Sequence, residues 1–279
     1  MPRDDQAFGN DLDEAKSDLV DAINELPVMV LMEVHANEAQ ATTPLYRCEE
    51  FRYAGAISGG TDLIKQRIRE DALPLLDDYD RNVTESLATT IRTKLTEWEG
   101  GSGTLAYVFK TDYLDDLSES LGLHYEVFQL LADIMESTSA VLNEARQHVL
   151  DIMRNATAQL GGIERSGGLS AEETAAAVIS GVVAGIATGG IGGVLIGSLT
   201  AAGSMIGNSE TVITGGSALE ILEDAGSKLD AIKSNLRESL DQIELSLDEI
   251  LNVTAGPRNG DFVGPDLGEM LSNFGSHEA

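Results

Sequence analysis

Residues 174–209 read TAAAVISGVVAGIATGGIGGVLIGSLTAAGSMIGNS and contain no charged side chain, although the whole chain carries a formal net charge of -29. Glycine recurs at every fourth position within this stretch, at Gly181, Gly185, Gly189, Gly193 and Gly197. Because residues four apart share one face of a helix, this spacing predicts a glycine stripe against which another helix backbone can pack closely. Glycines also cluster at 189–193 and weaken the helix there. We therefore expect an apolar, glycine-zipper helical hairpin with its tip near residues 190–193.

The larger side chains of this hairpin supply its apolar area. They are mainly Val182, Val183, Ile186, Leu195, Ile196 and Leu199. An exposed patch of this size drives association in water. We expect the hairpin to be covered in the soluble protein by the helices predicted at 104–160 and 217–252, or by another copy, and to engage a membrane conditionally. The alternative is a structural helical interaction protein in which the glycine zipper is an ordinary buried core.

The composition favours long helices and excludes some partners. Hydrophobic residues make up 42% of the 279 residues but aromatic residues only 5%, so the core should be aliphatic. The 47 acidic residues far outnumber the 18 basic ones. Nucleic acid is excluded as an expected partner, because phosphate binding needs clustered Lys and Arg. A hydrated acidic surface is typical of a halophilic protein or of a secreted, highly soluble one.

Helical periodicity covers most of the chain. After a flexible acidic arm at about 1–10, a short helix should kink or end at Pro27, and residues 36–60 form a partly structured connector. Two long helices are predicted at about 61–98, interrupted at Pro74, and at about 104–160, followed by a flexible joint at 161–168. A third long helix at about 217–252 carries leucine or isoleucine every seven residues, as in a coiled coil. These residues are Leu222, Leu229, Leu236, Ile243 and Ile250, and Leu219, Leu240 and Leu247 widen the seam.

The predicted fold is therefore all-α, an elongated bundle of long antiparallel helices that carries the apolar hairpin. We divide the chain into an N-terminal helix and connector (1–60), a long helical hairpin (61–160), the glycine-zipper hairpin (161–215), a coiled-coil-like helix (216–254) and a flexible tail (255–279).

Residues that could support catalysis are scattered. The four histidines, His35, His124, His148 and His277, have no metal-ligand spacing, and no phosphate-binding loop is present. The single cysteine, Cys48, has no sequence partner that would mark it as a nucleophile. We expect no enzymatic activity, no metal and no cofactor.

Trp98 is the only tryptophan, and it lies with Gly100 in the link between the two long helices at 61–98 and 104–160. Here the chain resembles the WXG-type, early-secreted-antigen-like substrates of type VII secretion, over about residues 61–160. The resemblance implies that the Trp-x-Gly tripeptide forms the turn of a helical hairpin and that Trp98 and Gly100 take part in partner recognition. The secretion signal Tyr-x-x-x-Asp/Glu of that family is absent after the second helix. Trp98 could instead simply pack at a hairpin turn.

The order of elements also resembles that of the cytolysin A and haemolysin B-L group of α-helical pore-forming toxins, in architecture only. The N-terminus has no basic segment followed by an apolar run, so no Sec-type signal peptide is indicated. We expect a non-enzymatic helical protein that is secreted by another route, associates conditionally with a membrane or a partner helical chain, and forms homo- or hetero-oligomers. The alternative location is the cytoplasm.

Overall fold

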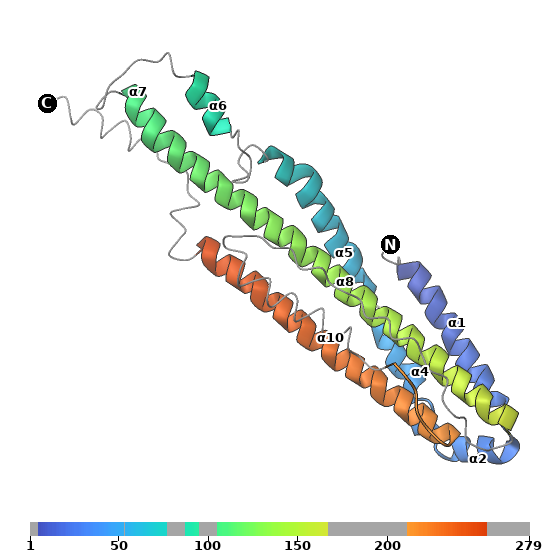
Figure 1. The fold of residues 1–279 in the computed structure, drawn as a ribbon. Coiled ribbons are helices and arrows are strands. Elements are labelled where there is room, and N and C mark those ends of the chain that lie inside the picture. Colours follow the sequence, from blue (N-terminus) through green and yellow to red (C-terminus); the bar gives the residue numbers. More distant parts are fainter. Residues whose placement is uncertain (1–4, 53, 77–86, 95–104, 167–210, 256–279) are drawn as a thin grey trace. The chain divides into compact units, whose positions relative to one another are not determined.

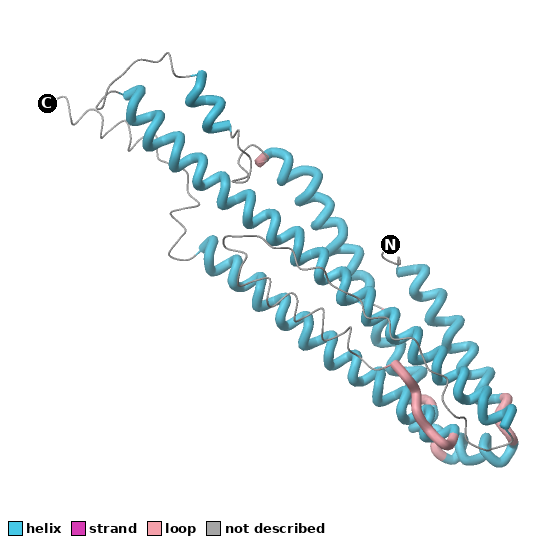
Figure 2. Tube along the Cα trace, in the orientation of Figure 1, coloured by secondary structure: helices cyan, strands magenta, loops and turns pink. Residues whose placement is uncertain are grey.

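A computed structural model describes residues 5–52, 54–76, 87–94, 105–166 and 211–255 (Figure 1). These residues are helical almost throughout and contain no β-strand (Figure 2), which confirms the predicted all-α class. They form two compact units. Unit 1 contains residues 5–52, 54–63, 135–166 and 211–244, and unit 2 contains residues 64–76, 87–94, 105–134 and 245–255.

Helix α1 (Asp5–Asn24) begins earlier than the sequence predicted. Phe8 is fully buried together with Leu12 and Leu19. Since Phe8 precedes Leu12 by one helical turn, it extends the apolar stripe and holds residues that we expected to form a loose acidic arm. That expectation was wrong for residues 5–10.

Short helices replace most of the predicted connector. Pro27 ends the first helical segment and precedes α2 (Val28–Ala36), because proline lacks an N–H but fits the position before a new helix. The chain continues through α3 (Glu38–Ala41), α4 (Thr43–Arg47) and the 3₁₀ helix η1 (Cys48–Phe51). Helix α5 (Ala54–Arg67) also begins before residue 61, where we had placed its start.

Helix α8 (Leu114–Ser166) passes through unit 1 from Met135 onwards, and one of its sides is buried there. It runs through Gly161 and Gly162, where we expected a flexible joint. Leu160 is fully buried, and this packing offsets the roughly 1 kcal/mol that a glycine costs inside a helix. The predicted joint was therefore wrong for residues 161–166.

Helix α10 (Ala218–Ala255) confirms the predicted heptad seam. All five seam residues are buried: Leu222, Leu229, Leu236, Ile243 and Ile250. The flanking Leu219, Leu240 and Leu247 are half-buried. A second row, also repeating every seven residues, is buried beside the first: Ala218, Ala225, Ile232, Ser239 and Ser246. These two rows correspond to the a and d positions of a coiled coil.

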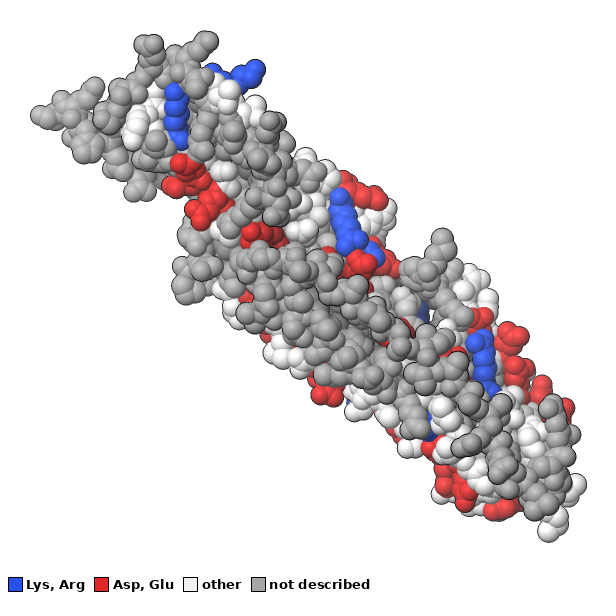
Figure 3. All heavy atoms as spheres, in the orientation of Figure 1, with Lys and Arg blue, Asp and Glu red and all other residues white. Residues whose placement is uncertain are grey.

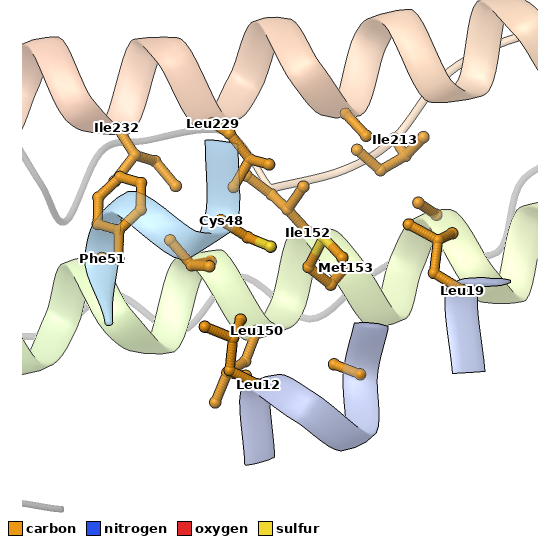
Figure 4. Close-up of a cluster of buried hydrophobic side chains, with 14 of the residues drawn as sticks. Leu12, Leu19, Cys48, Phe51, Leu150, Ile152, Met153, Ile213, Leu229 and Ile232 are labelled. Carbon is orange, nitrogen blue, oxygen red and sulfur yellow. The ribbon is translucent and has the colours of Figure 1, made fainter. Parts of the chain in front are cut away.

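The core of unit 1 joins α1, η1, α8 and α10 around aliphatic side chains. In Figure 4, α8 lies between α1 and α10, Leu12 lies beside Leu150, and Phe51 points toward Ile232. The end of α8 and the start of α10 lie at the same end of unit 1 as α2 (Figure 1).

Unit 2 contains two π-helical turns. The π-helix η2 (Ile68–Ala72) precedes the 3₁₀ helix η3 (Leu73–Leu75), which contains Pro74. The proline ring clashes with the carbonyl group four residues earlier, and the wider π-turn relieves that clash, so the predicted interruption at Pro74 is confirmed. The unit also contains α6 (Leu87–Lys94), α7 (Leu105–Val108) and the π-helix η5 (Phe109–Tyr113). In η5 the rings of Phe109 and Tyr113 stack, with their centres 5.1 Å apart.

Candidate functional site

The residues that the sequence singled out lie outside the described part of the chain. Trp98 and Gly100 fall between the end of α6 at Lys94 and the start of α7 at Leu105. The residues of the apolar hairpin fall between Ser166 and Thr211: Gly181, Val182, Val183, Gly185, Ile186, Gly189, Gly193, Leu195, Ile196, Gly197 and Leu199. The roles of these residues therefore stay predictions. The structure does describe the parts of the chain on either side of the hairpin segment.

The flank that follows the hairpin segment is held tightly in unit 1. The side-chain amide of Asn155 on α8 donates to the carbonyl oxygen of Thr211 at 2.9 Å, and Ile213 is buried in the core. The backbone N–H of Thr214 donates to the carboxylate of Asp224 at 2.7 Å, and this hydrogen bond ties the same segment to α10. This flank is therefore fixed to both long helices.

A capping arrangement then starts α10. The Ser217 hydroxyl accepts from the backbone N–H of Glu220 at 3.3 Å, and the Glu220 carboxylate accepts from the N–H of Gly216 at 2.8 Å. This is close to a capping box, which satisfies N–H groups that have no partner within the helix. A Cβ added to Gly215 would lie 2.8 Å from the backbone nitrogen of Ile221, so only glycine fits there.

The segment Arg47–Arg52, with the sequence RCEEFR, links α1 to α10. Its two apolar side chains, Cys48 and Phe51, are buried in the core. On one side, Glu49 pairs with Lys16 of α1, and Arg52 pairs with Asp13 of α1. Arg52 also donates to Glu49 within the segment at 2.6 Å.

The other side of the Arg47–Arg52 segment holds α10. Glu50 pairs with Lys233, and the Nε of Arg47 lies 3.0 Å from a carboxylate oxygen of Asp230. Arg47 also contacts Glu50 at 3.2 Å. The sequence contained a signal for this arrangement that we missed, because Arg47 and Glu50, like Glu49 and Arg52, are three residues apart with opposite charge.

The ion pairs shift the pKa values of the segment in the expected directions. The hydrogen bond from Arg52 lowers the pKa of Glu49 to about 2, although partial burial opposes the shift and Lys16 adds to it. The hydrogen bond from Lys233 lowers the pKa of Glu50 in the same way. Both carboxylates are therefore ionised at neutral pH, and their charges support the packing of three helical elements.

Arg146 of α8 is a buried cation in the same core. Its side chain is almost completely enclosed, and its guanidinium carbon lies 4.6 Å from the centre of the Phe8 ring. One of its terminal nitrogens donates to the carbonyl oxygen of Arg52 at 3.4 Å. A cation over an aromatic face is attracted by the ring quadrupole, so Arg146 connects α8 to α1 and to the Arg47–Arg52 segment.

Burial shifts the pKa values of three titratable groups in the described residues. Burial raises the pKa of the Cys48 thiol to about 12, so the thiol stays protonated at neutral pH and is a poor nucleophile. Burial lowers the pKa of His148 and raises that of Glu144, both on α8. In the described ranges, no group of three His, Cys, Asp or Glu residues could hold a metal ion.

No model of a known protein family, no curated protein and no solved structure matches this chain. None of the helices in its described part is both long enough and apolar enough to cross a bilayer.

Proposed function

We propose that this chain is a non-enzymatic helical protein that engages a membrane through the apolar segment 174–209. The observation that carries the proposal is the charge-free run itself, since a chain with a net charge of -29 would not keep such a segment unless it contacts apolar surroundings. The fixed flanks add support. Helix α8 ends at Ser166, before the segment, and the residues that follow the segment are tied to α8 and α10 by Asn155 and Asp224.

The length of the segment limits how it can insert. Broken near residues 190–193, each arm has about 15 residues and spans about 22 Å as a helix. The hydrocarbon core of a bilayer is about 30 Å thick. Shallow insertion of the hairpin, or a single span formed when it straightens on assembly, therefore fits better than a stable two-span anchor.

The same proposal covers the arrangement of the helices and the contacts with a partner chain. The helices form an elongated antiparallel bundle, and the glycine stripe of the zipper hairpin faces a neighbouring helix in the soluble form. Following the resemblance to WXG-type substrates, the protein is secreted and Trp98 and Gly100 contact a partner helical chain. Oligomerisation, with itself or with that partner, covers the apolar segment away from the membrane.

Leakage of dye-loaded liposomes tests the membrane function. Zwitterionic vesicles are the first choice, because the acidic chain is repelled by anionic lipid surfaces. The wild type should release the dye, and Gly189→Asp combined with Gly193→Asp should block release while helicity by circular dichroism is unchanged. The control is Asn24→Asp combined with Gln40→Glu, which adds the same two charges at exposed positions and should leak like the wild type.

The membrane function would be refuted if the wild type neither leaks nor partitions into lipid over a range of pH and salt. The glycine-rich segment would then be better explained as a protein–protein packing core.

A further inference from the structure

Helix α2 has apolar side chains on both of its faces. One face packs against the core of unit 1 through Val30, Leu31 and the buried Val34. The other face exposes Val28, Met29 and Met32, with 71%, 79% and 64% of their surface accessible. Large apolar side chains gathered on an exposed helix face, beside the exposed Glu33 and His35, are a feature of interaction surfaces.

These three exposed residues, which we call the α2 surface, form one patch. Met32 follows Val28 by four residues and therefore lies on the same side of the helix, with Met29 next to both. Methionine side chains are flexible and polarisable, and they adapt to differently shaped apolar partners. The α2 surface therefore has the chemistry of a docking site for an apolar helix face.

The charged residues that flank the α2 surface along the chain are all acidic. From Ser17 to Tyr46 the sequence contains five acidic residues and no Lys or Arg, and all five are exposed: Asp18, Asp21, Glu25, Glu33 and Glu38. Glu25 and Glu38 flank α2 at its two ends, and Glu33 lies one turn after Met29. Figure 3 shows Asp and Glu side chains on the visible surface at the end where α2 lies.

We propose that the α2 surface binds a cationic amphipathic helix of a partner protein. The apolar face of that helix would cover Val28, Met29 and Met32, and its Lys or Arg side chains would contact Glu25, Glu33 and Glu38. A second copy of this chain would bring the same acidic rim against itself, and that repulsion selects against it. The inference concerns a different surface from segment 174–209 and does not rest on the proposed membrane function.

Three matched synthetic peptides test the proposal. Each carries the same helical stripe of leucines, and the flanking positions hold Lys in the first peptide, Gln in the second and Glu in the third. Fluorescence anisotropy measures their affinity for the full chain. The Lys peptide should bind, and the other two should bind much more weakly. Rising salt concentration should lower the affinity of the Lys peptide.

Variants of the chain locate the binding site. Met29→Gln combined with Met32→Gln should lower the affinity for the Lys peptide by about tenfold or more, since it removes buried apolar area from the interface. Glu25→Gln, Glu33→Gln and Glu38→Gln together should also weaken it and flatten its salt dependence. The matched control is Leu245→Gln with Leu251→Gln, which changes two leucines of α10 that are 59% and 61% exposed, and it should bind like the wild type.

Methionine methyl spectra give a second measurement, because the chain has only 7 methionines. The Lys peptide should shift the signals of Met29 and Met32. Three results would overturn the proposal: unchanged affinity in the Met29/Met32 variant, equal binding of the Gln or Glu peptide, or absence of those shifts on binding. Self-association or vesicle binding that requires Met29, in place of peptide binding, would assign the surface to a second copy or to lipid and would equally overturn it.

Discussion

Glu49 offers a direct test of the link between α1 and α10. Replacing it with Gln keeps the shape of the side chain but removes the charge that pairs with Lys16 and Arg52. Because these contacts lower the pKa of Glu49 from 4.5 to about 2, they stabilise the folded state whenever the carboxylate is ionised.

The size of the effect follows from that pKa. At 1.36 kcal/mol per pKa unit, the lowering corresponds to about 3 kcal/mol. The Glu49 side chain is 34% exposed, however, and solvent screening reduces the value of such pairs. We therefore expect Glu49→Gln to lower the free energy of unfolding by about 1–2 kcal/mol at pH 7.

The effect has a defined pH dependence. A carboxylate whose pKa is depressed in the folded state contributes stability above its unfolded pKa, and this contribution is lost as the pH falls through its folded pKa. The difference between wild type and Glu49→Gln should thus be constant above pH 4.5 or so and should shrink between about pH 4.5 and pH 2.

Urea unfolding followed by circular dichroism at several pH values between about 2 and 7 measures this difference. Glu38→Gln is the control, since Glu38 is exposed and lies outside the Arg47–Arg52 network. A double-mutant cycle of Glu49→Gln with Lys16→Met isolates the coupling across α1. The reasoning would be refuted if the wild type and the Glu49→Gln variant were equally stable at pH 7, or if their difference in stability did not change with pH.

Three further predictions concern the same scaffold. His148 has a lowered pKa because it is partly buried, so on acidification the imidazole is protonated in the unfolded chain before it is protonated in the folded protein. The free energy of unfolding should therefore fall as the pH drops from about 6.5, and His148→Gln should reduce the fall measured between pH 7 and pH 5. Gly215→Ala should lower the melting temperature, because the new Cβ would lie 2.8 Å from the Ile221 nitrogen, whereas Gly161→Ala, with open space at its Cβ position inside α8, should stabilise by about 0.5–1 kcal/mol. Molar salt should raise the melting temperature by screening repulsion among the acidic side chains, and an unchanged melting temperature would contradict adaptation to high salt.

The spacing of apolar residues and of prolines predicted part of this fold from the sequence. The seam at Leu222, Leu229 and Leu236 was predicted from its spacing and is buried in α10. The break at Pro27 and the interruption at Pro74 followed from the missing N–H of proline. These features depend on neighbours within one or two helical turns, and for that reason the sequence alone determines them.

The tertiary structure decided which side chains meet over long distances. Lys16 and Glu49 are 33 residues apart, and the RCEEFR pattern does not indicate which helices its charges will reach. Likewise, Phe8 and Arg146 lie far apart in the sequence, and only the packing of α1 against α8 places the Arg146 guanidinium over the Phe8 ring. The sequence of α2 also does not indicate that Val34 is buried while Met29 is exposed.

The predicted site is divided in the same way. The charge-free run at 174–209 and the Trp98–Gly100 turn are read from the sequence alone, and they lie outside the described residues. What the tertiary structure adds is the anchoring of the flank at Thr211 to Asn155 and of Thr214 to Asp224. Hydrophobic character is a property of the residues themselves, so the sequence reveals it, whereas hydrogen bonds between distant segments exist only once the helices have packed together.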